Sequence, residues 1–115
     1  MSSPTERVFQ YEWTSAAAAR RAGDLDRAFA HLERAHIVGQ RHTWLHARAH
    51  CGMLAIGWQR RDRREIVGQL GRVIAALLFS RLWVPVGNTG GANVSPFTPM
   101  PLPDDLRTLL DGDGR

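Results

Sequence analysis

Apolar positions recur along most of this chain with the period of an α-helix. The turns between these stretches are short, so consecutive helices should pair as antiparallel hairpins. We therefore expect an all-α fold of two hairpins, a four-helix arrangement in a single domain over residues 1–115. The predicted helices cover about residues 6–22, 25–38, 42–57 and 62–80, with a short one over 104–110.

The spacing of the two hairpins resembles that of a known helical repeat. Gly23 and Gly57 each separate two predicted helices and lie one tetratricopeptide period, about 34 residues, apart. The second unit has a longer turn at Trp58–Arg61, and two units are fewer than a stable array needs. The period therefore supports a distantly tetratricopeptide-like pair of hairpins more firmly than a peptide-binding array.

The character of the chain changes between residues 83 and 103. Five prolines and three glycines exclude a helix from this segment. Large apolar residues, including Trp83, Val94 and Phe97, are interspersed among them. A segment with this apolar content is not a free linker. We expect it to be ordered, to wrap the bundle and to form a lid or wall over a site.

The predicted fourth helix should bury an apolar face. That face consists of Ile66, Leu70, Val73, Ile74 and Leu77. The arginine-rich turn before it, at Gln59–Glu65, is interpreted as a solvated helix start rather than as a phosphate site.

Composition and charge exclude several function classes. The net charge is +4, and all fifteen basic residues are arginine, a bias that gives basicity little weight as a sign of nucleic-acid binding. The lone Cys51 excludes an internal disulfide framework, and no signal-peptide pattern opens the chain. No apolar run approaches the roughly 20 residues of a membrane span. We expect a cytoplasmic protein with neither nucleic acid nor a membrane as partner.

Histidines are concentrated in the predicted second and third helices. His42, His46 and His50 lie four residues apart and share one face with apolar residues, so their imidazoles should point inward. His36 lies on the apolar side of the preceding helix. A buried imidazole without a partner costs about 1–3 kcal/mol, and a shared metal ion removes that cost.

The spacing favours one set of ligands among these histidines. His46 and His50, at i and i+4, present two nitrogens to one ion. His42 and His50 are about 12 Å apart along the helix axis and do not readily share an ion. The expected site combines His46 and His50 with His36, and His42 is a further candidate. No glutamate follows in the His-Glu-x-x-His manner, so a metallopeptidase is not supported.

Other residues with ligand chemistry have two interpretations each. Glu12 lies within the apolar stripe of the first helix, where an unpaired carboxylate costs several kcal/mol. It either pairs with an arginine or a backbone group or contributes to the histidine site. Glu33 precedes His36 with the Glu-x-x-His spacing of carboxylate-bridged metal bundles, but a single copy favours a solvated residue. Cys51 is interpreted as a small core residue.

Three segments resemble a known family. Leu32–Gln40 (LERAHIVGQ), the His46/His50 pair and Val84–Ser95 (VPVGNTGGANVS) resemble the signatures of a bacterial family of small stand-alone proteins, catalogued only as a domain of unknown function. The resemblance covers roughly residues 8–106. It implies a complete stand-alone domain and supplies no catalytic residues.

We therefore predict a helical protein that binds one first-row transition metal ion through His36, His46 and His50, with His42 and Glu12 as further candidates. The spacing does not distinguish iron, zinc, copper and nickel, and haem is less favoured. An open fourth position would allow a small metalloenzyme, whereas metal handling needs only the ligands. The alternative is a non-enzymatic interaction module with structural core histidines. A small-molecule ligand under residues 87–95 and a homodimer are both compatible with the sequence.

Overall fold

The computed structural model describes residues 2–79, 87–92, 94–95 and 97–112. Throughout this part of the chain the regular structure is helical, and no strand is present. The all-α prediction is therefore confirmed. The helices are α1 (Pro4–Arg21), α2 (Leu25–Gly39), α3 (Thr43–Arg60), α4 (Arg63–Phe79) and α5 (Asp104–Gly112).

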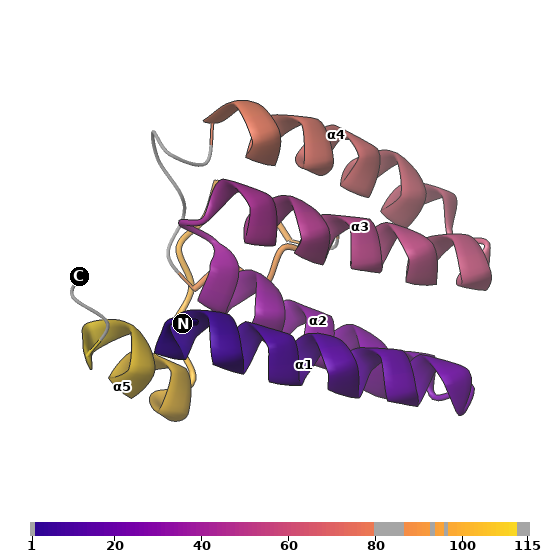
Figure 1. The fold of residues 1–115 in the computed structure, drawn as a ribbon. Helices are drawn as coiled ribbons and strands as arrows, with labels where there is room; N and C mark the ends of the chain where they lie inside the picture. The colour runs from indigo at the N-terminus through magenta and orange to yellow at the C-terminus, as the bar shows by residue number, and fades with distance from the viewer. Residues whose placement is uncertain (1, 80–86, 93, 96, 113–115) are drawn as a thin grey trace.

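The helices pack in chain order. α1 lies beside α2 and α3 lies beside α4, and the chain reverses direction between the members of each pair (Figure 1). α3 also packs against α2 and α1, so it lies between α4 and the first pair. The short α5 lies at the end of the bundle where α1 begins, in contact with α1 and α2 (Figure 1).

Local side-chain chemistry sets where the helices begin. The Ser3 hydroxyl accepts a hydrogen bond from the Glu6 backbone N–H, and the Glu6 carboxylate accepts one from the Ser3 N–H, a capping box around Pro4. Asp24 caps α2 by accepting from Arg27, and Asp62 accepts from the Glu65 N–H at the start of α4.

The apolar core has two clusters along the bundle. The first joins α1, α2 and α3 to α5 through Phe9, Ala35, Ile37, Val38, Ala49, Leu106 and Leu110. The second, toward the other end, consists of Ala16, Ala19, Ala28, Leu32, Met53 and Ile56. Many of these core positions are alanines, which let the helices approach closely. The rest of the interior contains polar side chains.

The predicted burial of the apolar face of α4 is wrong for three of its five residues, and the other two, Ile66 and Val73, are half-buried. Its buried side chains are Gln69 and Ala76, whereas Leu70, Ile74 and Leu77 are exposed. α3 is the only described helix that α4 contacts, because α4 lies at the outer edge of the row. The narrow face that α4 turns inward is therefore polar and small.

The C-terminal segment contacts the bundle where the structure describes it. Residues 83–86, 93 and 96 of the predicted wrap lie outside the described residues. The Arg72 guanidinium on α4 donates to the carbonyls of Gly90 and Val94, at 3.1 and 2.9 Å. The Ala92 N–H donates to the Glu65 carboxylate at 3.0 Å. Gly90, Ala92 and Val94 are thus attached to α4, while a complete wrap and the tetratricopeptide likeness stay predictions.

None of the described helices combines the length and the apolar character needed to cross a membrane.

Candidate metal centre

Three histidines converge in the interior of the bundle. His36 comes from α2, and His46 and His50 come from successive turns of α3; all three side chains are buried. Their Nε2 atoms form a nearly equilateral triangle, with 3.1 Å from His36 to each of the others and 3.2 Å between His46 and His50. The ring planes are inclined to one another by 42° to 69°. The three nitrogens therefore face a common point.

The triangle has the dimensions of a metal-ligand set. Nitrogens bound at about 2.0–2.1 Å are separated by about 3.3 Å in tetrahedral geometry and by about 2.9 Å at right angles. The observed separations of 3.1–3.2 Å lie between these values. The three nitrogens could hold one ion and would leave further coordination positions open.

Hydrogen bonds fix the tautomers of two of these rings. His36 Nδ1 lies 2.8 Å from the carbonyl oxygen of Asn88, which can only accept. His50 Nδ1 lies 2.6 Å from Oε1 of Gln69. Each Nδ1 must therefore carry the proton and donate it. In the neutral rings both Nε2 atoms are then bare lone pairs pointing into the triangle.

The orientation of the Gln69 amide is itself determined by its surroundings. This fully buried side chain donates through Nε2 to the Gly90 carbonyl at 2.8 Å and to the Glu65 carboxylate at 2.5 Å. Both of these groups are acceptors, so the amide nitrogen must face them and the oxygen must face His50. A chain of contacts thus links Glu65 on α4, through Gln69, to a ring nitrogen of the triangle.

His46 differs from the other two histidines. Its Nδ1 is buried and has no hydrogen-bond partner among the described residues. If His46 carries its proton on Nε2, that proton can form a well-aligned hydrogen bond with only one of the two neighbouring nitrogens. The Nδ1 atom is then an acceptor without a donor. If the proton is on Nδ1, it has no acceptor. In both tautomers the bare nitrogens of His36 and His50 remain 3.1 Å apart with no proton between them.

Burial keeps the three rings neutral. It lowers the pKa of His46 to about 4 and, together with the neighbouring His46, lowers the pKa of His50 to about 3. Desolvation, reinforced by the two neighbouring imidazoles, places the pKa of His36 well below its ordinary value. At neutral pH the rings therefore need not release a proton to bind a cation; His46 has only to carry its proton on Nδ1.

The glycine-rich segment holds the ring of His36. The buried Asn88 donates to the carbonyls of Ser95 and Thr98, both at 2.7 Å, and accepts from the Gly90 N–H. Gly90 has φ of +85°, and a Cβ on it would lie 2.6 Å from the His36 ring. Only glycine fits this turn against the imidazole.

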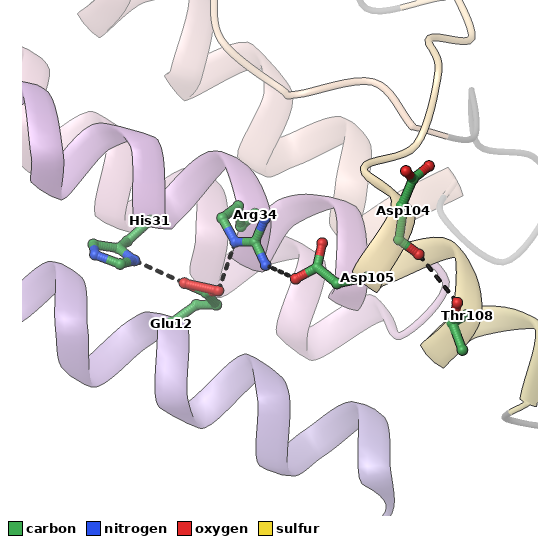
Figure 2. A network of polar contacts seen from close by, with 6 residues as sticks. All are labelled: Glu12, His31, Arg34, Asp104, Asp105 and Thr108. Carbon is green, nitrogen blue, oxygen red and sulfur yellow. Dashed lines mark hydrogen bonds and ion pairs between the residues drawn. The ribbon is translucent and has the colours of Figure 1, made fainter.

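Glu12, a candidate ligand by sequence, belongs to a different network. One carboxylate oxygen contacts His31 Nδ1 at 2.7 Å, and the other accepts from Arg34 Nε at 2.8 Å (Figure 2). Arg34 also pairs with Asp105 on α5 (Figure 2). Both oxygens are therefore occupied away from the triangle. The interpretation of Glu12 as the partner of an arginine is the one that the structure supports.

The remaining sequence candidates also lie outside the triangle. His42 is exposed at the N-cap of α3 and makes no capping hydrogen bond with its side chain. Cys51 is exposed, so its interpretation as a core residue is wrong. Glu33 is half-buried; burial and then the nearby Glu65 raise its pKa, while a hydrogen bond with Thr89 lowers it. Among the described residues, the His, Cys, Asp and Glu side chains close enough to share an ion are His36, His46 and His50.

Sequence analysis missed Gln69 and Asn88, which fix the rings of His50 and His36. Gln69 had a weak signal, since it lies opposite the apolar face of its predicted helix. Asn88 lies in an Asn-Thr-Gly stretch, where the glycines that follow it are the stronger turn signal.

A helical bundle enclosing three converging imidazole nitrogens belongs to the class of all-α proteins with a candidate metal site. The chain is a member of the family described as "Protein of unknown function (DUF3703)", whose model matches residues 3–110. This match confirms the resemblance to a domain of unknown function. No curated protein and no solved structure matches the chain.

Proposed function

We propose that this protein binds one divalent first-row transition metal ion through the Nε2 atoms of His36, His46 and His50. One observation carries the proposal: the bare nitrogens of His36 and His50 are held 3.1 Å apart by hydrogen bonds at their other ends. Two lone pairs facing each other in a dry interior are destabilising, whereas a cation between them makes both contacts favourable.

The surroundings of the rings support the same role. Histidines that bind metals generally donate their other N–H to a carbonyl, carboxylate or water, which fixes the ring and raises its basicity. His36 and His50 do so to the Asn88 carbonyl and the Gln69 amide oxygen. Glu65 accepts from Gln69 in turn and places a negative charge behind this contact.

The ligand set limits the chemistry of the ion. Three neutral imidazoles suit zinc, copper, nickel or iron. They leave both positive charges of a divalent ion uncompensated, so the open positions favour hydroxide or another anion. That arrangement serves a small metalloenzyme and a metal-handling protein alike.

Titration of protein purified without a histidine tag tests this proposal. Zinc and cobalt(II) should each bind with one ion per chain, and cobalt should give visible bands typical of nitrogen ligation. Free ion at 100 times Kd should stabilise the fold by about 2.7 kcal/mol, which raises Tm by roughly 10 °C or more for a chain of this size. The proposal is wrong if no ion co-purifies, binds in titration or raises Tm.

The same samples test the alternatives. A non-enzymatic interaction module with structural histidines requires a metal-free protein whose Tm does not respond to any of the four metals. Haem ligation requires a Soret band in the purified protein.

A further inference from the structure

The outer face of α4 is apolar and uncovered. Val67, Leu70, Ile74, Leu77 and Leu78 are between 49% and 69% exposed. At about 100° per residue they fall within one stripe about 100° wide. The buried Gln69 and Ala76 lie on the opposite side. α4 thus has the reverse of the usual polarity, with a polar side chain inward and its apolar side chains outward.

The size of this stripe is that of an interface. The five side chains together expose on the order of 500 Å², near the upper end of the largest patch that a monomer normally leaves uncovered. A specific dimer buries about 800 Å² per partner, of which apolar area is somewhat more than half. The α4 stripe alone therefore exposes about as much apolar area as one partner of such a dimer buries.

A glycine lies at the midpoint of α4, beside the edge of the stripe. Gly71 is the midpoint of α4, which runs from Arg63 to Phe79, and it is exposed. Nothing lies within 4 Å of the position that its Cβ would occupy. Glycine in a helix interior costs about 1 kcal/mol relative to alanine, and nothing within this chain requires it there. A small residue at the midpoint lets a second helix approach the backbone most closely where two helices cross.

The charge at one end of the stripe favours a second copy of this chain in the antiparallel orientation. Arg63 is exposed, lies on the same side of α4 at its N-terminal end, and no acidic residue interrupts the stripe. Two parallel copies would bring the Arg63 guanidiniums together. Two antiparallel copies place each Arg63 beside the C-terminal carbonyls of the other α4, where a cation is favourable.

We infer that two copies of this chain associate through α4, antiparallel and related by a twofold axis at Gly71. Apolar side chains of the stripe lie on both sides of that point, Val67 and Leu70 before it and Ile74, Leu77 and Leu78 after it, so the stripes of two antiparallel copies overlap around a twofold axis. The inference does not depend on metal binding, since the stripe and the histidine triangle lie on opposite sides of α4.

Sedimentation equilibrium of the whole protein, with and without zinc, tests the dimer. Wild type should be dimeric in both states. Ile74→Glu should raise the dimer Kd at least 100-fold while leaving the circular dichroism spectrum unchanged, because residue 74 is exposed within a chain. Tyr11→Glu, at an equally exposed residue of α1, is the matched control and should remain dimeric. A monomeric wild type, or a dimer that survives Ile74→Glu, overturns the inference.

Disulfide trapping in a Cys51→Ser background tests the direction. Gly71→Cys should cross-link on oxidation, because residue 71 of both copies lies at the axis. Leu78→Cys should not, because seven residues from the axis on each side place the two sulfurs about 20 Å apart. Efficient cross-linking of Leu78→Cys would show parallel helices and overturn the proposed arrangement.

Discussion

Two polar clusters of the same bundle each contain buried side chains, and their polar groups meet opposite kinds of partner. Glu12, His31, Arg34 and Asp105 form a network in which acids meet bases (Figure 2). The His36, His46 and His50 triangle contains only bases, and burial keeps their rings neutral. The first network pairs its charges within the chain, whereas the second brings bare nitrogens together and leaves the buried Nδ1 of His46 without a partner among the described residues.

This difference separates a structural polar group from a binding site. The buried carboxylate of Glu12 is already paired with a guanidinium and contacts a histidine ring nitrogen, so it needs no ion to offset its burial. Buried nitrogens that face one another have spare lone pairs and no donors. Residue types alone do not distinguish the two clusters, since each contains one histidine of α2, His31 in the first and His36 in the second. The clusters differ in whether their acceptor atoms have donors.

Removal of His46 should have the largest effect on metal binding. His46→Leu should weaken zinc affinity by about 1,000-fold or more, since one of three ligands is lost. It should leave the metal-free protein equally or more stable, because it removes a buried nitrogen that lacks a partner. Calorimetric titration and urea unfolding of the same samples measure both effects. His31→Leu is the matched control, and equal loss of affinity in it would contradict the comparison.

Acid should destabilise the metal-free protein by several kcal/mol. The histidines of the unfolded chain take up protons near pH 6.5, while burial lowers the pKa of His46 to about 4 and that of His50 to about 3 in the fold. The unfolded state therefore binds more protons between these values, and stability is full above pH 6.5 and falls as the pH drops toward 3. Urea unfolding at a series of pH values measures this slope. The double variant His46→Leu, His50→Leu should flatten it.

Loss of the Glu12 carboxylate should affect folding alone. Glu12→Ala removes a buried acceptor of two bonds, and about 2 kcal/mol of stability should be lost, since the partly exposed Arg34 can still reach Asp105 and water. Zinc affinity of the folded variant should stay within twofold of wild type. A drop of tenfold or more would place Glu12 in the metal site after all.

The sequence was sufficient to predict the helices and the proximity of His36, His46 and His50. Helical periodicity is local, so it predicts an all-α fold without knowledge of the packing. The i, i+4 spacing of His46 and His50 aligns two rings on one helix, and the apolar surroundings of His36 direct it inward. The three rings are expected to converge because a buried imidazole requires a polar partner.

Features that depend on tertiary packing could not be predicted. The support of His50 by Gln69 depends on which face of α4 turns inward, and the apolar pattern pointed to the opposite face. The support of His36 by Asn88 depends on a backbone carbonyl, which any residue type supplies. The choice between the two interpretations of Glu12 required knowing that Arg34 reaches it.

Loss of the support behind His50 should weaken binding moderately. Gln69→Leu removes the acceptor of the His50 N–H, and zinc affinity should fall by about 10- to 100-fold, as is usual when a residue behind a metal ligand is lost. Gln69→Glu retains an acceptor and should recover part of the affinity. Cobalt spectra should shift in both variants, because a freed ring changes the ligand field. Unchanged affinity in Gln69→Leu would show that the Nδ1 contact of His50 has no role in binding.

The smallest effect should come from His42, the third histidine of the i, i+4, i+8 series. Its side chain is exposed at the N-cap of α3 and makes no capping bond. His42→Ala should therefore change neither zinc affinity by more than about twofold nor unfolding free energy by more than about 0.5 kcal/mol. His42→Asp should instead stabilise the fold by about 1 kcal/mol, since its carboxylate can accept a hydrogen bond from the backbone of the first turn and lies at the positive end of the helix dipole. A loss of zinc affinity in His42→Ala comparable to that in His46→Leu would mean that the metal-bound protein draws the start of α3 into the site.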